Sequence, residues 1–260
     1  MSRPDTSLEI YRVVERIGRE ELARPISSLA WSGLAAGVAI SFSVFGKAFL
    51  VRALPEAPWA ILVAGFGYTV GFVIVILGRL QLFTEDTLTV VLPTFRRFTA
   101  VKLARMLRLW GVVFAANMAG TAAVAAVTVF GGLQTTATLD AILAIARHDF
   151  AAKSATATFL HGLPAGFLIA SLVWILPRAG GGGIWAIVLL TYVIAVGDFS
   201  HVVAGAVEVW TLLFAGEVGL GRAVGGLLLP ALAGNVVGGT GLFALLAYEQ
   251  VRGEFEGAGG

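Results

Sequence analysis

One histidine stands inside a stretch of chain that is otherwise apolar enough to cross a lipid bilayer. His201 ends a polar run, residues 197–201, that interrupts an apolar block of residues 184–215. An imidazole titrates near neutral pH, and an ionisable group at membrane depth is a candidate functional group by default. The alternative is a histidine that only makes hydrogen bonds in a packed interface. The functional interpretation predicts that His201 faces a passage for a solute.

A second interruption lies in the apolar block of residues 59–92. Its polar and charged side chains are those of Arg79, Gln81, Thr84, Glu85 and Asp86. A charge at membrane depth is costly unless it is paired or hydrated. We therefore expect Arg79 to pair with an acid across the two halves of the chain, with Glu208 and Asp86 as the candidates. Glu208 follows His201 by seven residues and shares its helical face if the helix restarts at once.

The elements that carry these residues have to be membrane helices. Of the 260 residues, 58% are hydrophobic and 13% are charged, which is about half the charged share of a soluble domain. The mean hydropathy is +0.89, and the apolar residues come in blocks of the roughly 20 that cross a bilayer. The composition therefore favours a polytopic, all-α integral membrane protein over a soluble helical protein with a large core.

Other function classes find no support in the sequence. The chain has no Cys, which excludes disulfides and thiolate chemistry. We find neither a paired-histidine metal motif nor a Gly-x-Ser-x-Gly elbow, so we expect no enzyme, no metal site and no cofactor. A net charge of +2 is too small to indicate a nucleic-acid partner. The expected partners are a small solute and membrane lipid.

We expect six spans within one transmembrane domain of residues 29–248. Their approximate ranges are residues 29–51, 59–92, 109–130, 156–176, 184–215 and 223–248. Residues 1–28 lack the apolar core of a signal peptide, and Ile10, Val13, Val14 and Ile17 fall on one helical face. They predict an amphipathic helix that is either solvated or rests on the membrane surface or the pore mouth. Residues 249–260 form a charged tail.

The distribution of basic residues predicts the orientation. Six spans place both termini on one side of the membrane. Twelve Lys and Arg residues fall on that side and four on the other. Because cytoplasmic loops carry an excess of Lys and Arg, we expect both termini, with the terminal helix and tail, in the cytoplasm and the protein in the inner membrane.

The two halves of the chain resemble each other in sequence. Residues 117–121 read Asn-Met-Ala-Gly-Thr in the third span, and Asn235 begins a related run, 118 residues later, in the sixth. His201 follows Thr84 by 117 residues, so we match the two interruptions through this pair. An odd number of spans per half makes the second copy inverted. Inverted repeats with interrupted helices are typical of transport proteins, with the solute site near the midplane. The alternative is a pair of ordinary kinks at glycine-rich packing sites.

Short sequences in these segments carry a family resemblance. They are Leu82-Phe83-Thr84, Asn117 with Gly120, Phe199-Ser200-His201, and Pro230-Ala-Leu-Ala-Gly-Asn-Val-Val-Gly-Gly239. In this order the chain resembles the formate/nitrite transporter family over residues 28–250. The resemblance implies an aquaporin-like arrangement of two inverted three-helix repeats with interrupted second and fifth helices, and a homopentamer with a separate pore in each protomer.

The resemblance also implies roles for single residues. Leu82 and Phe83 would form a hydrophobic constriction, with Thr84 on a loop beside it and His201 at the pore centre. Asn117 and Asn235 would be structural polar residues of the pore helices, and Lys153 would match a lysine near the family's fourth span. A solute would then cross as a neutral acid, or as an anion paired with His201, because a bare charge in a dry constriction is very costly.

The chain also departs from the family pattern. Gln81 and Ser200 stand where the family has glutamate, and Gly166 and Gly205 stand where it has pore-lining asparagines. Glu85 and Asp86 are unfavourable neighbours for an anion. We therefore expect a channel or transporter for small monovalent anions or their acids. The alternatives are a channel for a small neutral solute and a non-transporting regulatory membrane protein.

Overall fold

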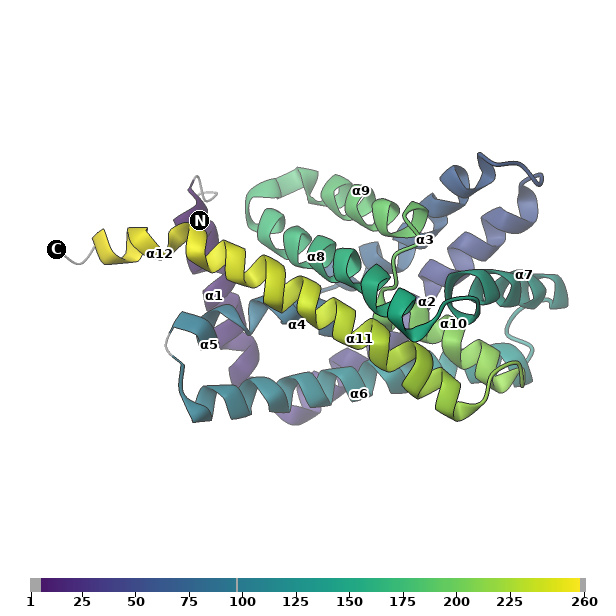
Figure 1. Ribbon diagram of the computed structural model, residues 1–260, viewed down its shortest axis with the longest axis horizontal. Helices are drawn as coiled ribbons and strands as arrows, with labels where there is room; N and C mark the ends of the chain where they lie inside the picture. The colour runs from purple at the N-terminus through teal and green to yellow at the C-terminus, as the bar shows by residue number, and fades with distance from the viewer. Residues whose placement is uncertain (1–5, 97, 258–260) are drawn as a thin grey trace.

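The fold consists of helices throughout the part of the chain that the structure describes. The computed structural model describes residues 6–96 and 98–257, and no strand occurs among them. The first half contains α1 (Ser7–Ala23), α2 (Ile26–Ala53), α3 (Ala60–Leu77), α4 (Phe83–Thr89), α5 (Leu92–Arg96) and α6 (Ala100–Phe130). The second half contains α7 (Thr136–Ala146), η1 (Arg147–Ala151), α8 (Ala155–Ala179), η2 (Gly180–Gly182), α9 (Gly183–Val196), α10 (Val202–Phe214), η3 (Arg222–Leu228), α11 (Leu229–Val236), η4 (Val237–Ala244) and α12 (Leu245–Gly257). Figure 1 shows the long helices running side by side.

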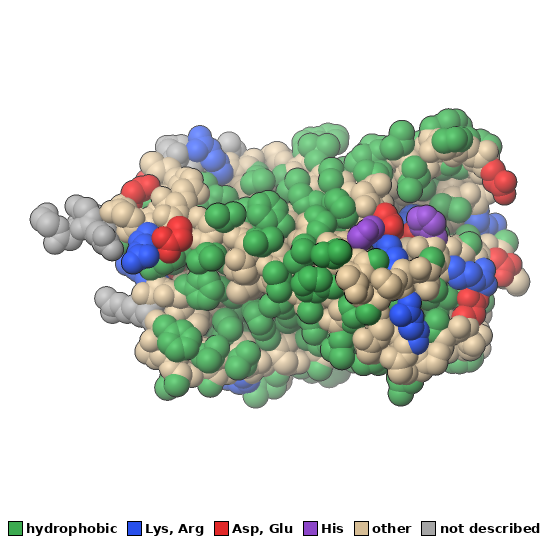
Figure 2. Space-filling view, in the orientation of Figure 1, with side chains coloured by type: hydrophobic (Ala, Val, Ile, Leu, Met, Phe, Trp, Pro, Cys, Tyr) green, Lys and Arg blue, Asp and Glu red, His purple; other side chains and the backbone are tan. Residues whose placement is uncertain are grey.

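The long helices have the length and surface of membrane spans. Five helical stretches of the described residues are long and apolar enough to cross a bilayer, and α10 is a shorter apolar helix. Large apolar side chains face outward from them, for example Phe130 and Trp185, which are 71% and 67% exposed. In Figure 2 apolar side chains cover the middle of the molecule, and most charged side chains lie toward its two ends. The expected multi-pass, all-α membrane fold is confirmed.

The helices repeat in two sets of three crossing segments. In the first half α2 packs against α3 and α6, and in the second half α8 packs in the same way against α9 and α11. The short helix of each half crosses to the other half, since α4 contacts α8 and α10 contacts α2. This exchange brings the two interruptions together in the interior of the molecule.

Both interruptions end their helices by the same local geometry. Arg79 and Asp198 adopt left-handed backbone conformations, with φ values of 52° and 54°. The N–H of the next residue, Leu80 or Phe199, bonds back across the last turn to Val75 or Ile194, each at 3.0 Å. This is the hydrogen bond of a Schellman-type helix end. Equivalent positions within the two interruptions are therefore 119 residues apart.

The spacing of 119 residues corrects the match of Thr84 with His201. In the structure the position equivalent to His201 is Leu82, because both residues precede the first turn of a short helix. Thr84 and His201 do meet, but across the two halves and not as equivalents.

One asparagine in each half satisfies the polar backbone of an interruption. The Oδ1 atom of Asn117 accepts from the N–H of Phe83 at 3.0 Å, and its Nδ2 atom donates to the carbonyls of Gly33 and Gln81 at 2.8 and 2.9 Å. Asn235 repeats this pattern, accepting from Val202 at 2.8 Å and donating to Gly162 and Ser200 at 3.0 and 2.8 Å. The helix ends thus keep hydrogen-bond partners without water.

Glycines let these asparagines approach their neighbouring helices. A Cβ atom at Gly37 would lie 2.4 Å from the carbonyl oxygen of Asn117, and one at Gly166 would lie 2.2 Å from that of Asn235. Both distances are too short for any other residue. Gly166 is therefore a point of close helix packing, as small residues often are in membranes, and not a vacated pore-lining position.

The N-terminal helix packs beneath the spans. Thr6 and Glu9 form a capping box at the start of α1, and the helix contacts α4, α5, α8 and α12. Tyr11 is buried and donates a hydrogen bond to the carbonyl of Leu92 at 3.1 Å; burial, with Glu15 nearby, raises its pKa above the usual range. Residues 7–23 of the expected N-terminal segment thus form a helix packed against other helices, and whether it is solvated or rests on the membrane surface or the pore mouth stays a prediction; residues 1–5 lie outside the described part.

Two segments differ from the expected pattern. The stretch between the third and fourth spans is α7 followed by the π-helical turn η1. Its apolar side chains Ile142 and Ile145 pack with Val44 and Phe45 of α2. The sixth span is longer than expected, since helix continues from Arg222 to Gly257 and includes most of the tail of residues 249–260, whose last three residues lie outside the described part.

We expect the substitution Asn235→Leu to lower the thermal unfolding midpoint of the purified protein strongly. It leaves the N–H of Val202 and two carbonyls without partners, and each such buried group costs about 1–3 kcal/mol. Asn117→Leu should have a similar effect. Gln250→Leu, which removes an exposed amide, is the control. Unchanged midpoints for both asparagine variants would contradict this account.

Candidate functional site

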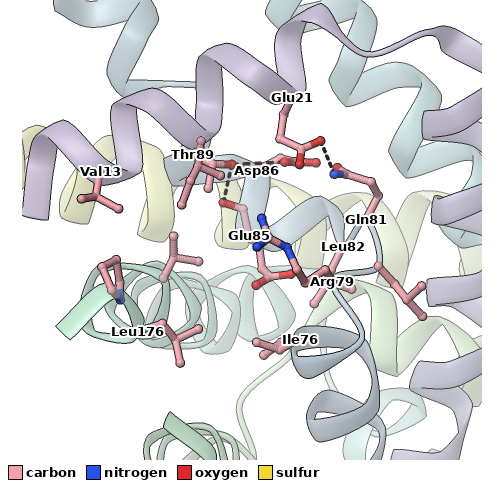
Figure 3. A pocket seen from close by; sticks show the side chains of 14 residues that line it. Val13, Glu21, Ile76, Arg79, Gln81, Leu82, Glu85, Asp86, Thr89 and Leu176 are labelled. Carbon is pink, nitrogen blue, oxygen red and sulfur yellow. Dashed lines mark hydrogen bonds between the residues drawn. The ribbon is translucent and has the colours of Figure 1, made fainter. Parts of the chain in front are cut away.

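A cavity of about 300 Å³ lies between α1 and the first interruption (Figure 3). We call it the α1 vestibule. Its apolar wall comes mainly from α1, the end of α3 and the end of α8, and its polar wall comes from residues 79–89 and from Glu21 of α1. It is lined by Val13, Ile17, Glu21, Ile76, Arg79, Leu80, Gln81, Leu82, Glu85, Asp86, Thr89, Val173, Leu176 and Pro177.

The polar wall of the α1 vestibule is acidic. Glu21 accepts hydrogen bonds from Arg24, at 2.9 Å, and from the amide of Gln81. Asp86 accepts from the hydroxyl of Thr89 at 3.2 Å through its Oδ1 atom. Its Oδ2 atom and the Oε1 atom of Gln81 are buried without a hydrogen-bond partner among the described residues. These two oxygens are enclosed by protein atoms and do not face the open part of the cavity.

The structure separates the two residues expected at the constriction. Leu82 lines the α1 vestibule and is 1% exposed. The ring of Phe83 instead packs edge to face against Trp110 and Phe114 of α6, with centroid distances of 5.6 and 5.2 Å. Leu82 is thus one of the apolar side chains of the vestibule wall, and Phe83 packs the start of α4 against α6.

His201 lies beyond Leu82 and joins the two interruptions. Its Nε2 atom is 2.7 Å from the hydroxyl oxygen of Thr84, and the ring of Phe72 packs edge to face on it at 5.0 Å. Its Nδ1 atom accepts the N–H of Ala204 at 3.1 Å and so caps α10. Because a backbone N–H only donates, Nδ1 holds no proton. The neutral imidazole therefore carries its proton on Nε2 and donates it toward Thr84.

A second, smaller cavity lies on the other side of His201. Its volume of about 10 Å³ is about the room that one water molecule needs. Lys47, Tyr68 and Asp149 contribute to its wall, together with Phe150, Ile194, Ala195, Asp198, Phe199, His201 and Glu208. Glu208 is 1% exposed, and its Oε2 atom has no partner among the described residues. His201 and Glu208 share this cavity, as their spacing predicts.

Ion pairs surround this second cavity. Lys47 bonds to Asp149, and Lys153 donates to the side chain and the carbonyl of Asp198 at 2.8 and 2.9 Å. His161 also bonds to the Asp198 carbonyl, at 2.8 Å. Outside the lining of this cavity, hydrogen bonds from Arg147 lower the pKa of the Glu217 carboxyl. Lys153 thus holds the second interruption in place.

The expected partner of Arg79 is not found. Arg79 is exposed at the α1 vestibule, whereas Glu208 lines the cavity beyond His201. Among the described residues no ion pair joins Arg79 to Glu208 or to Asp86. The left-handed turn at Arg79 directs its side chain to the vestibule beside Glu85 (Figure 3), so the charge faces this cavity and is not paired across the halves.

The sequence alone does not identify Lys47, Tyr68, Asp149 and Phe150, which line the second cavity, as site residues. Phe150 occupies the space beside Gly205, where a Cβ atom would lie 2.0 Å from its ring. Gly205 is thus covered by an aromatic ring and does not face an open passage. Lys47, a lone charge within an apolar block, was the one local signal. The others lie in or against η1, whose position depends on contacts distant in sequence.

His148, Asp149 and Asp198 offer ligand atoms that lie within 4.8 Å of one another. Lys47 and Lys153 already neutralise the two carboxylates. This cluster is accordingly a set of ion pairs at the outer end of the second interruption.

Comparisons with known proteins identify the family of the chain. The sequence profile of the family described as Formate/nitrite transporter matches residues 8–249. The chain is 37% identical to the Inner membrane protein YfdC of Escherichia coli (strain K12) over 249 residues, which cover 96% of this chain and 80% of that protein.

Two solved structures share the fold. One, titled "FNT family ion channel", has a TM-score of 0.79 at 20% identity and covers 95% of this chain and 98% of its own. The other, titled "Pentameric formate channel with formate bound", has a TM-score of 0.72 at 17% identity and covers 92% of this chain and 98% of its own. Members of this family are channels or transporters and not enzymes. The chain belongs to the formate/nitrite transporter family.

Proposed function

We propose that the protein conducts small monovalent acids or their anions, of the formate and nitrite class, through a passage that runs from the α1 vestibule past Leu82, Thr84 and His201 to the second cavity. The observation that carries this proposal is the hydrogen bond of 2.7 Å between Thr84 and His201. It joins the two interruptions between the two cavities, where transporters of this architecture bind their solutes.

The assembly and orientation belong to the same proposal. The protein would form a homopentamer, like the pentameric formate channel that shares its fold, with one passage in each protomer. It would lie in the inner membrane, as the name of its Escherichia coli relative states for that protein. The excess of Lys and Arg on the side of the termini favours a cytoplasmic α1 vestibule.

The mechanism follows from the fixed tautomer of His201. With Nδ1 engaged by the N–H of Ala204, the imidazole meets a solute as an Nε2–H donor. A carboxylate or nitrite oxygen can take this hydrogen bond in place of the Thr84 hydroxyl, and the hydroxyl can then donate to the same solute. Because Leu82, Phe72 and Phe199 keep the surroundings apolar, crossing is easiest for a solute whose charge is cancelled by a proton.

A neutral solute is the second candidate, favoured by the acidic wall of the α1 vestibule. Glu21, Glu85 and Asp86 line the vestibule with a single basic residue, Arg79, and this lining suits a neutral molecule such as glycerol better than an anion. Flux of formate, nitrite, acetate and glycerol into proteoliposomes distinguishes the two. Saturable formate or nitrite flux supports the first candidate, flux of glycerol alone supports the second, and no flux of any solute contradicts both.

We expect His201→Asn to reduce formate flux at least about tenfold, the low side of what a positioned proton donor contributes. Asparagine is a good N-cap, so it can still accept the N–H of Ala204 and keep α10 in place, while the Nε2–H donor is lost. His148→Asn, at an exposed histidine, is the matched control. Formate flux at the unmodified rate in His201→Asn would exclude a role for the imidazole.

We expect Leu82→Ala to raise glycerol flux several-fold, because it removes the apolar side chain between the vestibule and the Thr84–His201 pair. Leu160→Ala makes the same change at an outward-facing position that is 52% exposed, and it should leave the flux unchanged. Stopped-flow light scattering of proteoliposomes measures both. Equal glycerol flux in Leu82→Ala and the unmodified protein would show that the constriction lies elsewhere.

A further inference from the structure

We propose that residues 147–153, which we call the η1 strap, close the far end of the passage, and that the ring of Phe150 is the side chain that blocks it. This inference rests on the proposed function, since it concerns the route by which a solute leaves the second cavity. The strap consists of η1 and the two residues after it. Figure 1 places α7, which leads into the strap, at the end of the molecule opposite α1.

The second cavity is too small for the proposed solutes. Its volume of about 10 Å³ is about the room that one water molecule needs, and a formate or nitrite ion is larger than water. A solute can therefore pass only if part of the cavity wall moves. That wall is formed by α2, α3, the end of α9 with the second interruption, α10 and the η1 strap.

Among these wall elements the η1 strap is held in place mainly by side chains. Its backbone hydrogen bonds are local, for example from the N–H of Ala152 to the carbonyl of Arg147 at 2.9 Å. The other elements are longer helices that pack against neighbouring helices, and the second interruption is fixed by Asn235. A short segment with few ties to the rest can open locally, and π-helical turns are frequent at functional sites. The strap is therefore the wall element that can move at the lowest cost.

The strap also forms the layer between the second cavity and the protein surface. The side chain of His148 is 65% exposed, whereas Phe150, two residues later, is 4% exposed and lines the cavity. The Phe150 ring fills the space that a side chain at position 205 would take, and Gly205 has no Cβ atom to compete with it. An aromatic ring therefore closes the cavity on the side of the strap.

Two ion pairs hold the strap on either side of this ring. Asp149 accepts a hydrogen bond from Lys47 of α2, whose side chain is 8% exposed. Lys153 donates to the side chain of Asp198 at 2.8 Å, and its Nζ atom lies 5.9 Å from the centroid of the Phe150 ring. Because breaking a buried ion pair leaves an uncompensated charge, both pairs favour the closed strap.

A single introduced thiol can report on access to the cavity without a measurement of flux, because the chain has no Cys. Ala195 lines the second cavity and is 7% exposed. In the purified, detergent-solubilised variant Ala195→Cys we expect slow reaction with N-ethylmaleimide, a reagent much larger than the cavity. Mass spectrometry of the intact protein follows the modified fraction over time. Asp140→Cys, at an exposed position of α7, gives the rate of an accessible thiol.

We expect Phe150→Ala, combined with Ala195→Cys, to raise the rate of modification at least about tenfold, because removal of a buried ring leaves a cavity in its place. Lys47→Met removes an ion pair but keeps the ring; it should also raise the rate, and it provides a second variant if Phe150→Ala unfolds. Phe130→Ala makes the same change at a position that is 71% exposed and should leave the rate unchanged. A thermal unfolding midpoint well above the assay temperature shows that each variant is folded.

The same substitution should change the selection of solutes by size. In proteoliposomes Phe150→Ala should raise acetate flux several-fold relative to formate flux, because acetate is the larger ion and the ring narrows the exit. Phe130→Ala should leave the ratio of acetate flux to formate flux unchanged.

Two results would overturn the inference. One is an unchanged rate of modification in the folded variants, which would mean that the strap does not limit access to the cavity. The other is an unchanged ratio of acetate to formate flux in Phe150→Ala, which would mean that the solute does not pass the ring. Faster modification in a protein that passes no solute at all would instead contradict the proposed function and leave the closure by the strap intact.

Discussion

The structure depends on how two stretches of unwound backbone find hydrogen bonds at membrane depth. Water and lipid cannot supply these bonds in a dry interior, so protein groups must do so. Asn117 and Asn235 each bond to three backbone groups, two in the interruption of their own half and one in its first span. Once these bonds form, α4 and α10 are fixed in direction, and the interior positions of Leu82, Thr84 and His201 follow.

The two halves keep this backbone arrangement while their side chains differ. Arg79 and Asp198 occupy equivalent left-handed positions with opposite charges. Leu82 and His201 occupy equivalent positions before the two short helices, one apolar and one able to donate a proton in a hydrogen bond. The repeat therefore provides a symmetric frame, and the chemistry comes from the positions at which the halves differ.

Most of the fold could be predicted from the sequence, because the sequence features that define the helices are local. Blocks of about 20 apolar residues predict spans, and the Gly78-Arg79 and Gly197-Asp198 pairs end helices. The asparagines could be matched because each recurs in a similar run of small residues. The exact equivalence was harder, since Thr84 and His201 are both polar and a shift of two residues leaves the pattern almost unchanged.

The site could be predicted only where one residue carries the chemistry. His201 stands out because it is a lone imidazole in an apolar block. Phe150 does not, because its contact with Gly205 depends on how η1 folds back over α10. The same holds for Lys47 and Asp149, which are 102 residues apart, and for the vestibule, which exists only because α1 folds beneath α4.

The helix cap made by His201 has a consequence for the movement of protons across the membrane. A chain of proton hops passes through an imidazole only if one ring nitrogen takes up a proton while the other gives one away. Here the Nδ1 atom of His201 accepts the N–H of Ala204, so the ring cannot pass a proton from one nitrogen to the other. In the proposed passage a proton would therefore cross only together with the solute, and not by hopping through the imidazole ring.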